Sequence, residues 1–289
     1  MVAIYAVIAA AVYCIVGLSF ALCYATGRFF DFGHAAVLAV CPYCVLFLTR
    51  TLDFPLAVAL PVALALGALL GAAKELAVYR PLRVRHASPL VLLIASIGVY
   101  LVLQNSISLA FGDDTKTLAF GPVREGFAIL GARITTIQVA VLIAAAIVVS
   151  GGAFLLRRTR TGTHIRAVGE SPPLALSVGI DAPHVGMLSA CIGSALAGLA
   201  GSLIALDVGM TPTMGMRALL MGVVAMIIGG SQSPLGISLG ALLLALSGAL
   251  ATQLLGSQWQ DPTAFFALLV FLLMRPQGVM GKLTLISNG

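Results

Sequence analysis

Residues 157–183 read RRTRTGTHIRAVGESPPLALSVGIDAP, a polar and basic segment between two long apolar runs. Ser171 can cap a helix by accepting hydrogen bonds from backbone N–H groups, and Pro172 suits the first helical position, where no donor is needed. Gly179 can adopt the left-handed conformation just past a helix end. These signals predict one short helix over Ser171–Val178.

This predicted helix has an apolar side although it lies in the most basic segment of the chain. A helix in that place has no membrane to cross and no core of its own, so we expect another protein to receive its apolar side. The alternative is an ordinary cytoplasmic loop whose helix lies at the membrane surface, and the residues alone favour neither. Asp181 and Pro183 predict the cap and first turn of the next long helix. Four residues form the apolar side: Leu174, Ala175, Leu176 and Val178.

The sequence on either side is that of an integral membrane protein. Of its residues, 60% are hydrophobic and 9% are charged, whereas soluble domains carry roughly a quarter charged residues. The apolar runs are continuous and do not alternate, which favours helices over a β-barrel. We predict an all-α polytopic bundle of eight or nine transmembrane segments with broken helices, forming a single domain over residues 1–289. The candidate spans are 2–25, 34–49, 55–78, 89–111, 135–156, 183–206, 214–230, 234–255 and 262–274.

Basic residues predict the orientation of these spans. Loops 79–88 and 157–183 are rich in arginine and lie two spans apart, so the positive-inside rule places both on the cytoplasmic side. Loop 112–134 mixes acidic and basic residues, as expected outside. Counting spans then puts the N-terminus outside, and Arg275 and Lys282 inside. The formal net charge of +6 is explained by this bias and does not call for a nucleic-acid partner.

Two interruptions break the apolar pattern inside the predicted membrane region: TGRFFDFGH at 26–34 and GMTPTMG at 209–215. Paired glycine or proline breaks in the two halves of a transporter point to the translocation path, because the N-termini of half-helices direct positive dipole ends at an anionic group. These breaks supply five candidates for a substrate path: Asp31, Gly33, His34, Pro212 and Gly215.

Alternatives stay open for several of these positions. Ionisable residues at membrane depth are functional candidates, but a plain cytoplasmic turn explains Asp31 equally well, because the neighbouring Arg28 suggests that the turn reaches the surface. Gln104 and Asn105 are adjacent amides in the fourth apolar run. They are further path candidates, although hydrogen bonds between helices would explain them as well.

The sequence carries no catalytic motif. It contains no nucleotide-binding loop of the GxxxxGK[ST] type, and its histidines and cysteines lack metal-ligand spacing. We therefore expect the chain to bind no cofactor or metal, and any ATP to be bound by a different chain. The CPYC motif at 41–44 has the spelling of a redox site, but it lies within an apolar run without a nearby cation, which disfavours thiol chemistry.

Eight segments, each weak alone, resemble a known family in their order and spacing. They are FDFGHAAVLAV from Phe30, KELAVYRPLR from Lys74, SPLVLLIASIGVYLVLQNS from Ser88, RTRTGTHIRAVGE from Arg158, SVGID from Ser177, SALAGLAGSLIALDVGMTPTMG from Ser194, IIGGSQSPLGISLGALLLALSGAL from Ile227 and RPQGVMGK from Arg275. Over nearly its whole length the chain resembles the permease subunits of branched-chain amino acid ABC importers of the LIV type, with their urea and amide relatives.

The resemblance implies a permease of the bacterial inner membrane that moves aliphatic amino acids or a small amide such as urea. Its implied partners are a second permease, identical or homologous, two cytoplasmic ATP-binding subunits and a periplasmic or extracellular solute-binding protein. The resemblance also implies that 157–183 is the coupling loop, which docks on an ATP-binding subunit. The coupling residues would be Ser171, Leu174, Ala175, Leu176, Val178 and Gly179.

The chain departs from the family pattern at two places. The coupling helix of the family usually carries Glu-Ala-Ala, whereas Pro173 and Leu174 stand at the first two positions here. The first break usually has Asn where this chain has Asp31, an acid that could alter substrate preference or pair with Arg28. The main alternative to a permease is a self-contained channel or secondary transporter for a small polar solute. Such a transporter would require buried ion-coupling residues and would not require a docking helix.

Overall fold

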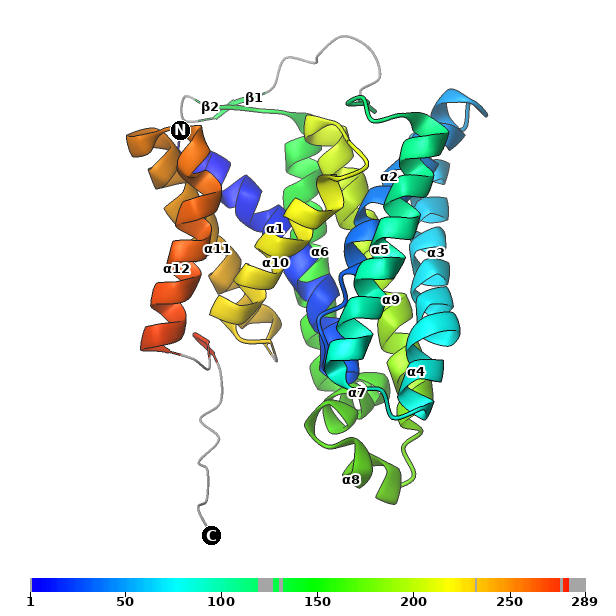
Figure 1. Cartoon of the computed structure of the whole chain (residues 1–289). Coiled ribbons are helices and arrows are strands. Elements are labelled where there is room, and N and C mark those ends of the chain that lie inside the picture. The colour runs from blue at the N-terminus through cyan, green and yellow to red at the C-terminus, as the bar shows by residue number, and fades with distance from the viewer. Residues whose placement is uncertain (1, 119–126, 130–131, 232, 276–277, 281–289) are drawn as a thin grey trace.

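The computed structural model of the chain describes residues 2–118, 127–129, 132–231, 233–275 and 278–280. These residues form a bundle of long helices (Figure 1). Seven of the described helical segments are long and apolar enough to cross a membrane, which confirms the predicted all-α polytopic fold. They are α1 (Val2–Gly27), α2 (Gly33–Arg50), α3 with its continuation (Leu56–Val84), α5 (Pro89–Phe111), α6 (Thr136–Arg158), α9 (Ala182–Val208) and α11 (Pro234–Leu255).

Shorter elements complete the described part of the chain. The continuation of α3 (Leu56–Lys74) consists of a π-helical turn, η1, and α4. Each of the nine candidate spans corresponds to a helix, and those at 214–230 and 262–274 correspond to the shorter helices α10 and α12. The shorter helices are η1 (Glu75–Tyr79), α4 (Arg80–Val84), α7 (Arg160–Glu170), α8 (Pro172–Ser177), α10 (Met214–Gly229), η2 (Ser257–Trp259) and α12 (Gln260–Met274).

Helix α1 lies in the middle of the bundle and packs against α6, α9, α10 and α11. Every residue from Cys14 to Leu22 is buried. A helix that is apolar on all sides is suited to this position, because it has no polar face to leave unsatisfied. Small residues allow its neighbours to come close: a Cβ atom on Gly17 would lie 2.9 Å from the backbone oxygen of Gly222 in α10.

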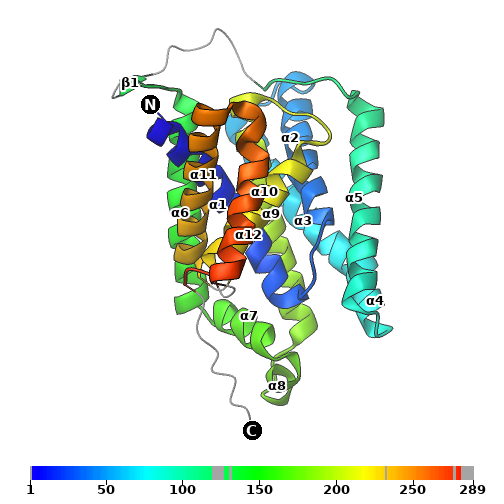
Figure 2. The same ribbon diagram turned by 60° about the vertical axis from the view of Figure 1, so that its left-hand side comes forward.

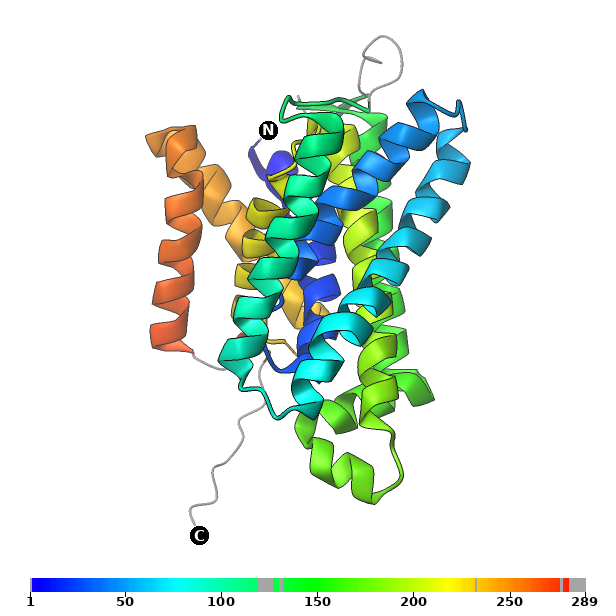
Figure 3. The same ribbon diagram turned by 45° about the vertical axis from the view of Figure 1, so that its right-hand side comes forward.

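The outer helices expose large apolar side chains. Helix α5 packs mainly against α2 and stands at one edge of the bundle (Figure 2). On its free side, Leu109 is 90% exposed. Helix α12 lies at another edge (Figure 3) and exposes Phe266 and Leu273. These faces fit lipid or another membrane chain, since either would cover apolar surface.

The two ends of the bundle differ. Helices α4, α7 and α8 lie at one end, and the short antiparallel strands β1 (Phe127–Ile129) and β2 (Ala132–Ile134) lie at the other, near the N-terminus (Figure 1). The two arginine-rich loops thus share one end, as the orientation argument requires, and which side of the membrane this end faces stays a prediction. The strands were not predicted. Residues 119–126 and 130–131 of the opposite loop and Lys282 lie outside the described residues.

Candidate functional site

The predicted docking helix forms as α8, with Ser171 at its N-cap position. The predicted side-chain cap is wrong, however, because Ser171 makes no side-chain cap hydrogen bond. A capping hydroxyl accepts from the second or third helical N–H group, and Pro173 at the second position has none. The backbone oxygen of Ser171 instead accepts from the N–H group of Ala175 at 3.0 Å.

The end of α8 follows the prediction. Gly179 adopts the left-handed conformation, with φ of +84°. The N–H group of Ile180 donates to the backbone oxygen of Ala175 at 3.0 Å, which closes the helix end. Asp181 caps the next helix as predicted, because its Oδ1 accepts from the N–H group of His184 at 3.3 Å.

The apolar residues of α8 divide into two sets. Ala175 is 2% exposed and packs in a small apolar cluster with Val168 of α7 and Val185 of α9. The other three apolar side chains of this segment are exposed. Their exposed fractions are 69% for Leu174, 57% for Leu176 and 73% for Val178. One residue therefore holds the helix in place, and three are available to another molecule.

Helix α7, directly before α8, was not predicted. Thr159 caps it by accepting from the N–H group of Gly162 at 3.1 Å. Ile165 and Val168, three residues apart, are buried on one side of the helix. This cap and this spacing are visible in the sequence. The helix was not predicted because the arginines and glycines of this segment are typical of a surface loop.

The end of α7 contacts the first helix break. A Cβ atom on Gly169 would lie 2.8 Å from the backbone oxygen of Ala25, so α7 crosses the end of α1 closely. The guanidinium group of Arg28 donates to the backbone oxygen of Glu170 at 3.1 Å. Arg28 holds a positive φ of +55°, a strained conformation for a residue other than glycine. The segment with the exposed apolar side chains is thus linked directly to the segment that carries Asp31.

Asp31 is buried and does not lie in a plain surface turn, although Arg28 does reach the surface. Its carboxylate forms an ion pair of 2.7 Å with the Lys74 ammonium group and accepts a hydrogen bond from the Tyr79 hydroxyl group. The possible pairing of Asp31 with Arg28 is therefore wrong, and the partner is Lys74. In this linker between two spans, burial by itself would raise the pKa of Asp31. The nearby Lys74 and His34 and the hydrogen bonds from Lys74 and Tyr79 outweigh burial and lower it.

The π-helical turn η1 explains how Lys74 and Tyr79 reach the same carboxylate. In an α-helix, residues five apart point about 140° away from each other, because each residue turns the chain by about 100°. Hydrogen bonds from i to i+5 widen the turn and bring such residues towards one side. The same turn carries Glu75, which forms a second ion pair with Arg83. Two buried acids therefore lie at this place, each paired with a cation.

His34 is enclosed next to this cluster. It is 0% exposed, its Nε2 atom lies 3.1 Å from the Ser19 hydroxyl oxygen, and its Nδ1 atom lies 3.8 Å from the Cys23 sulfur. Gly33 leaves room for the cluster, since a Cβ atom there would lie 2.9 Å from the Tyr79 hydroxyl oxygen. Among the described residues, no group of three His, Cys, Asp or Glu side chains could hold a metal ion.

The second break meets the first. Gly209 is left-handed, with φ of +90°, and Pro212 is buried. Helix α10 then begins against α2: a Cβ atom on Gly215 would lie 2.0 Å from the backbone oxygen of Ala35. The two breaks, about 180 residues apart in sequence, are thus neighbours in space. Their part in a substrate path stays a prediction.

Among the described residues, neither Gln104 nor Asn105 forms a side-chain hydrogen bond with the breaks. Asn105 is exposed, and its amide donates to the backbone oxygen of Leu101 within the same helix at 2.7 Å. Their place in a substrate path also stays a prediction. From α5, Ser96 is hydrogen-bonded to the first break: its hydroxyl oxygen accepts from the N–H group of Phe32 at 3.0 Å. Sequence reasoning did not select Lys74, Tyr79 or Ser96, because nothing in the sequence pairs them with residues 31–32.

A membrane-crossing bundle with paired helix breaks, and with a short helix presenting apolar side chains beyond one end, defines a polytopic transport component. The comparison with known proteins makes this specific. The family described as "Branched-chain amino acid transport system / permease component" matches residues 2–275, and the chain belongs to this family.

Individual relatives agree with this assignment. The chain is 28% identical to the high-affinity branched-chain amino acid transport system permease protein BraD of Pseudomonas aeruginosa, over 93% of this chain and 92% of that protein. It is 32% identical to the permease protein LivH of Salmonella typhimurium, over 72% and 68%. It is 27% identical to a probable LivH of Methanocaldococcus jannaschii, over 92% and 88%. These relatives are transport permeases.

Proposed function

We propose that the chain is the membrane permease of an ATP-driven importer for branched-chain or other aliphatic amino acids, or a related small amide. A second permease, identical or homologous, would complete the path across the bacterial inner membrane. Two cytoplasmic subunits would bind and hydrolyse ATP, and a solute-binding protein would deliver the substrate from outside. The names of the relatives support the substrate class, and this chain itself would bind no cofactor.

The observation that carries the ATP-driven part of this proposal is the exposed side of α8. Leu174 and Leu176 of this six-residue helix, and Val178 directly after it, are exposed at the arginine-rich end of the bundle. Exposed apolar side chains gain free energy when a partner covers them. A groove on an ATP-binding subunit would receive them as grooves receive the apolar side of a helix. The proposal requires α8 to lie in the cytoplasm, the N-terminus outside and the end of α12 inside.

The contacts suggest how a movement of α8 would reach the membrane. Helix α8 follows α7 after a single residue, and Ala175 is packed against α7. The end of α7 is bound to Arg28, three residues before Asp31. A displacement of α8 would therefore pull on the break that holds the Asp31–Lys74 ion pair. ATP would drive transport by favouring one conformation of this break over another.

A single substitution on α8 tests this proposal. Leu174→Asp should leave the permease folded and in the membrane, since the side chain is 69% exposed, but should abolish ATP-dependent uptake in reconstituted vesicles while ATP hydrolysis continues. Val84→Asp is a matched control, because Val84 is 72% exposed on α4 at the same end of the bundle. Normal uptake by the Leu174→Asp permease, or equal losses in both variants, would contradict docking through α8.

The alternative, a self-contained secondary transporter, has one observation in its favour. Asp31 and Glu75 are buried acids near the breaks, as ion coupling requires. Each is paired with a cation of the same chain, however, and that arrangement also fits a structural pair. Uptake by the purified chain alone, without ATP and driven by an ion gradient, would establish the alternative.

A further inference from the structure

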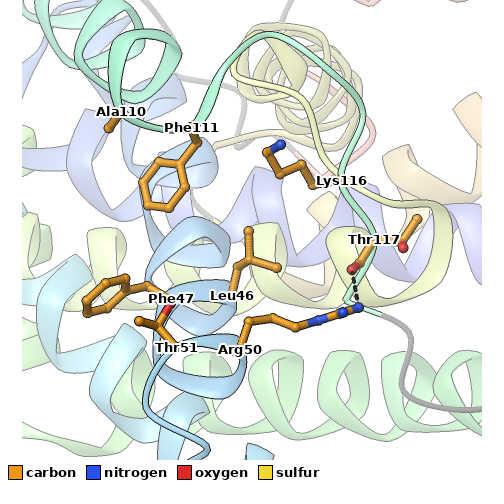
Figure 4. Close-up of a pocket in the computed structure, with 8 residues that line it drawn as sticks. All are labelled: Leu46, Phe47, Arg50, Thr51, Ala110, Phe111, Lys116 and Thr117. Atoms are coloured by element: carbon orange, nitrogen blue, oxygen red, sulfur yellow. Dashed lines mark hydrogen bonds between the residues drawn. The ribbon is translucent and has the colours of Figure 1, made fainter.

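At the end of the bundle opposite α8, an open cleft of about 470 Å³ lies between the last turns of α2 and α5 and residues 116–117 (Figure 4). Both helices are membrane spans that end at the cleft, at Arg50 and Phe111. The cleft therefore lies where a span leaves the apolar part of the bilayer and meets the lipid headgroups.

One side of the cleft is cationic. Arg50 donates a hydrogen bond to the backbone oxygen of Thr117 at 3.5 Å. Lys116 is fixed through its backbone, which exchanges hydrogen bonds of 2.9 and 2.8 Å with Met210. Its ammonium group has no hydrogen-bond or ion-pair partner among the described residues. Within the described part of the chain, no acidic residue lines the cleft, so the site favours an anion.

The other side of the cleft is apolar and continues into the membrane. Leu46, Phe47 and Phe111 form this wall (Figure 4). The Phe111 ring is held by the ring of Tyr43, with 5.0 Å between the centroids. Phe47 is 45% exposed, so this wall is open to the bilayer. A ligand that fills this site must therefore combine an anionic head with an apolar part that extends along the spans.

We propose that the cleft binds an anionic phospholipid, with its phosphate between Lys116 and Arg50 and an acyl chain along Phe47 and Phe111. A free aliphatic amino acid fits less well, because its ammonium group would lie beside two cations, and no acid is among the described residues that line the cleft. An acidic side chain of a docked protein would satisfy the cations but would leave the apolar wall uncovered. The site is independent of the proposed function, since lipid binding needs neither ATP nor a transport partner.

Native mass spectrometry of the purified chain, with equal amounts of phosphatidylglycerol and phosphatidylcholine, tests the proposal. We expect phosphatidylglycerol to be retained in preference. Each basic residue near a membrane surface contributes about 1 kcal/mol to the binding of anionic lipid. Lys116→Gln and Arg50→Gln should therefore each weaken phosphatidylglycerol binding about five-fold, and the double variant about 25-fold.

Two further variants serve as controls. Lys116→Arg keeps the charge and should bind phosphatidylglycerol normally. Arg217→Gln removes one positive charge outside the cleft, where Arg217 pairs with Asp261, and should also bind normally. Size-exclusion chromatography checks the folding of every variant. Arg50→Gln also removes the hydrogen bond to Thr117 and could unfold for that reason. In that case the result for Lys116→Gln is used, because the Lys116 ammonium group makes no hydrogen bond within the described chain.

Three results would overturn the proposal. Lys116→Gln and Arg50→Gln could retain phosphatidylglycerol as well as the unchanged chain does. Phosphatidylcholine could bind equally, which would mean that the cations play no part. Inorganic phosphate or leucine, added at the concentration of the lipid, could displace phosphatidylglycerol completely, which would make the cleft a site for a soluble anion or for an amino acid.

Discussion

Lys74→Met removes the cation that neutralises Asp31 and should destabilise the permease strongly. The charged groups are 2.7 Å apart, and their side chains are only 5% and 9% exposed. At an effective dielectric constant of about 20, the attraction at this distance is roughly 6 kcal/mol, and the cost of desolvating both groups offsets much of it. Removing one partner leaves a buried, unpaired carboxylate, so we expect a loss of about 3–5 kcal/mol in the free energy of unfolding.

A double-mutant cycle separates the ion pair from simple packing effects. Thermal unfolding in detergent would be followed for Lys74→Met, Asp31→Asn and the double variant. The double variant should recover most of the stability lost by Lys74→Met, because it has no unpaired charge and the amide introduced by Asp31→Asn can still accept from the Tyr79 hydroxyl group. Wild-type stability of Lys74→Met, or a double variant whose loss equals the sum of the single losses, would refute this reasoning.

Two further predictions follow from the helix breaks. Gly215→Ala should separate α10 from α2 and lower the folded yield, because its Cβ atom would lie 2.0 Å from the Ala35 oxygen. Gly98→Ala is the control: a Cβ atom there has no neighbouring atom within 4 Å, and the higher helix propensity of alanine should stabilise the fold by about 0.5–1 kcal/mol. Equal yields of the two variants in size-exclusion chromatography would show that this contact is not needed. Arg28→Gly keeps the positive φ of +55° without strain but removes the bond to Glu170, so the permease should stay folded while uptake per ATP hydrolysed falls. An unchanged ratio of uptake to ATP hydrolysis would show that the bond between Arg28 and Glu170 does not transmit movement from α8 to the first break.

The sequence predicted the membrane helices well because their signal is local. Each span is an apolar run of sufficient length, and each candidate corresponds to a helix. The stop signal of α8 was also local: a glycine free to adopt positive φ at Gly179. The error at Ser171 has a local cause as well, since Pro173 removes one of the two N–H groups that its hydroxyl could have bound.

The contents of the site were harder to predict because they depend on pairs that are distant in sequence. Asp31 was selected as an ionisable residue in a break, but its partner Lys74 is 43 residues away in the sequence. The sequence does not indicate which basic residue the fold brings next to Asp31. The π-helical turn that aligns Lys74 with Tyr79 was not predicted from the sequence. Gly215 was selected as part of a break, and only the structure shows that it lies against Ala35.

The central position of α1 has a consequence for biosynthesis. This segment leaves the ribosome well before its neighbour α9, which begins about 155 residues after α1 ends. At roughly 5–20 residues per second, α1 must wait about 10–30 s for that neighbour. Because it carries no charged side chain, it can wait in the lipid or beside the translocon without exposing an unpaired charge. A charge introduced near Gly17 would therefore impair the insertion of α1 into the membrane before it could destabilise the assembled bundle.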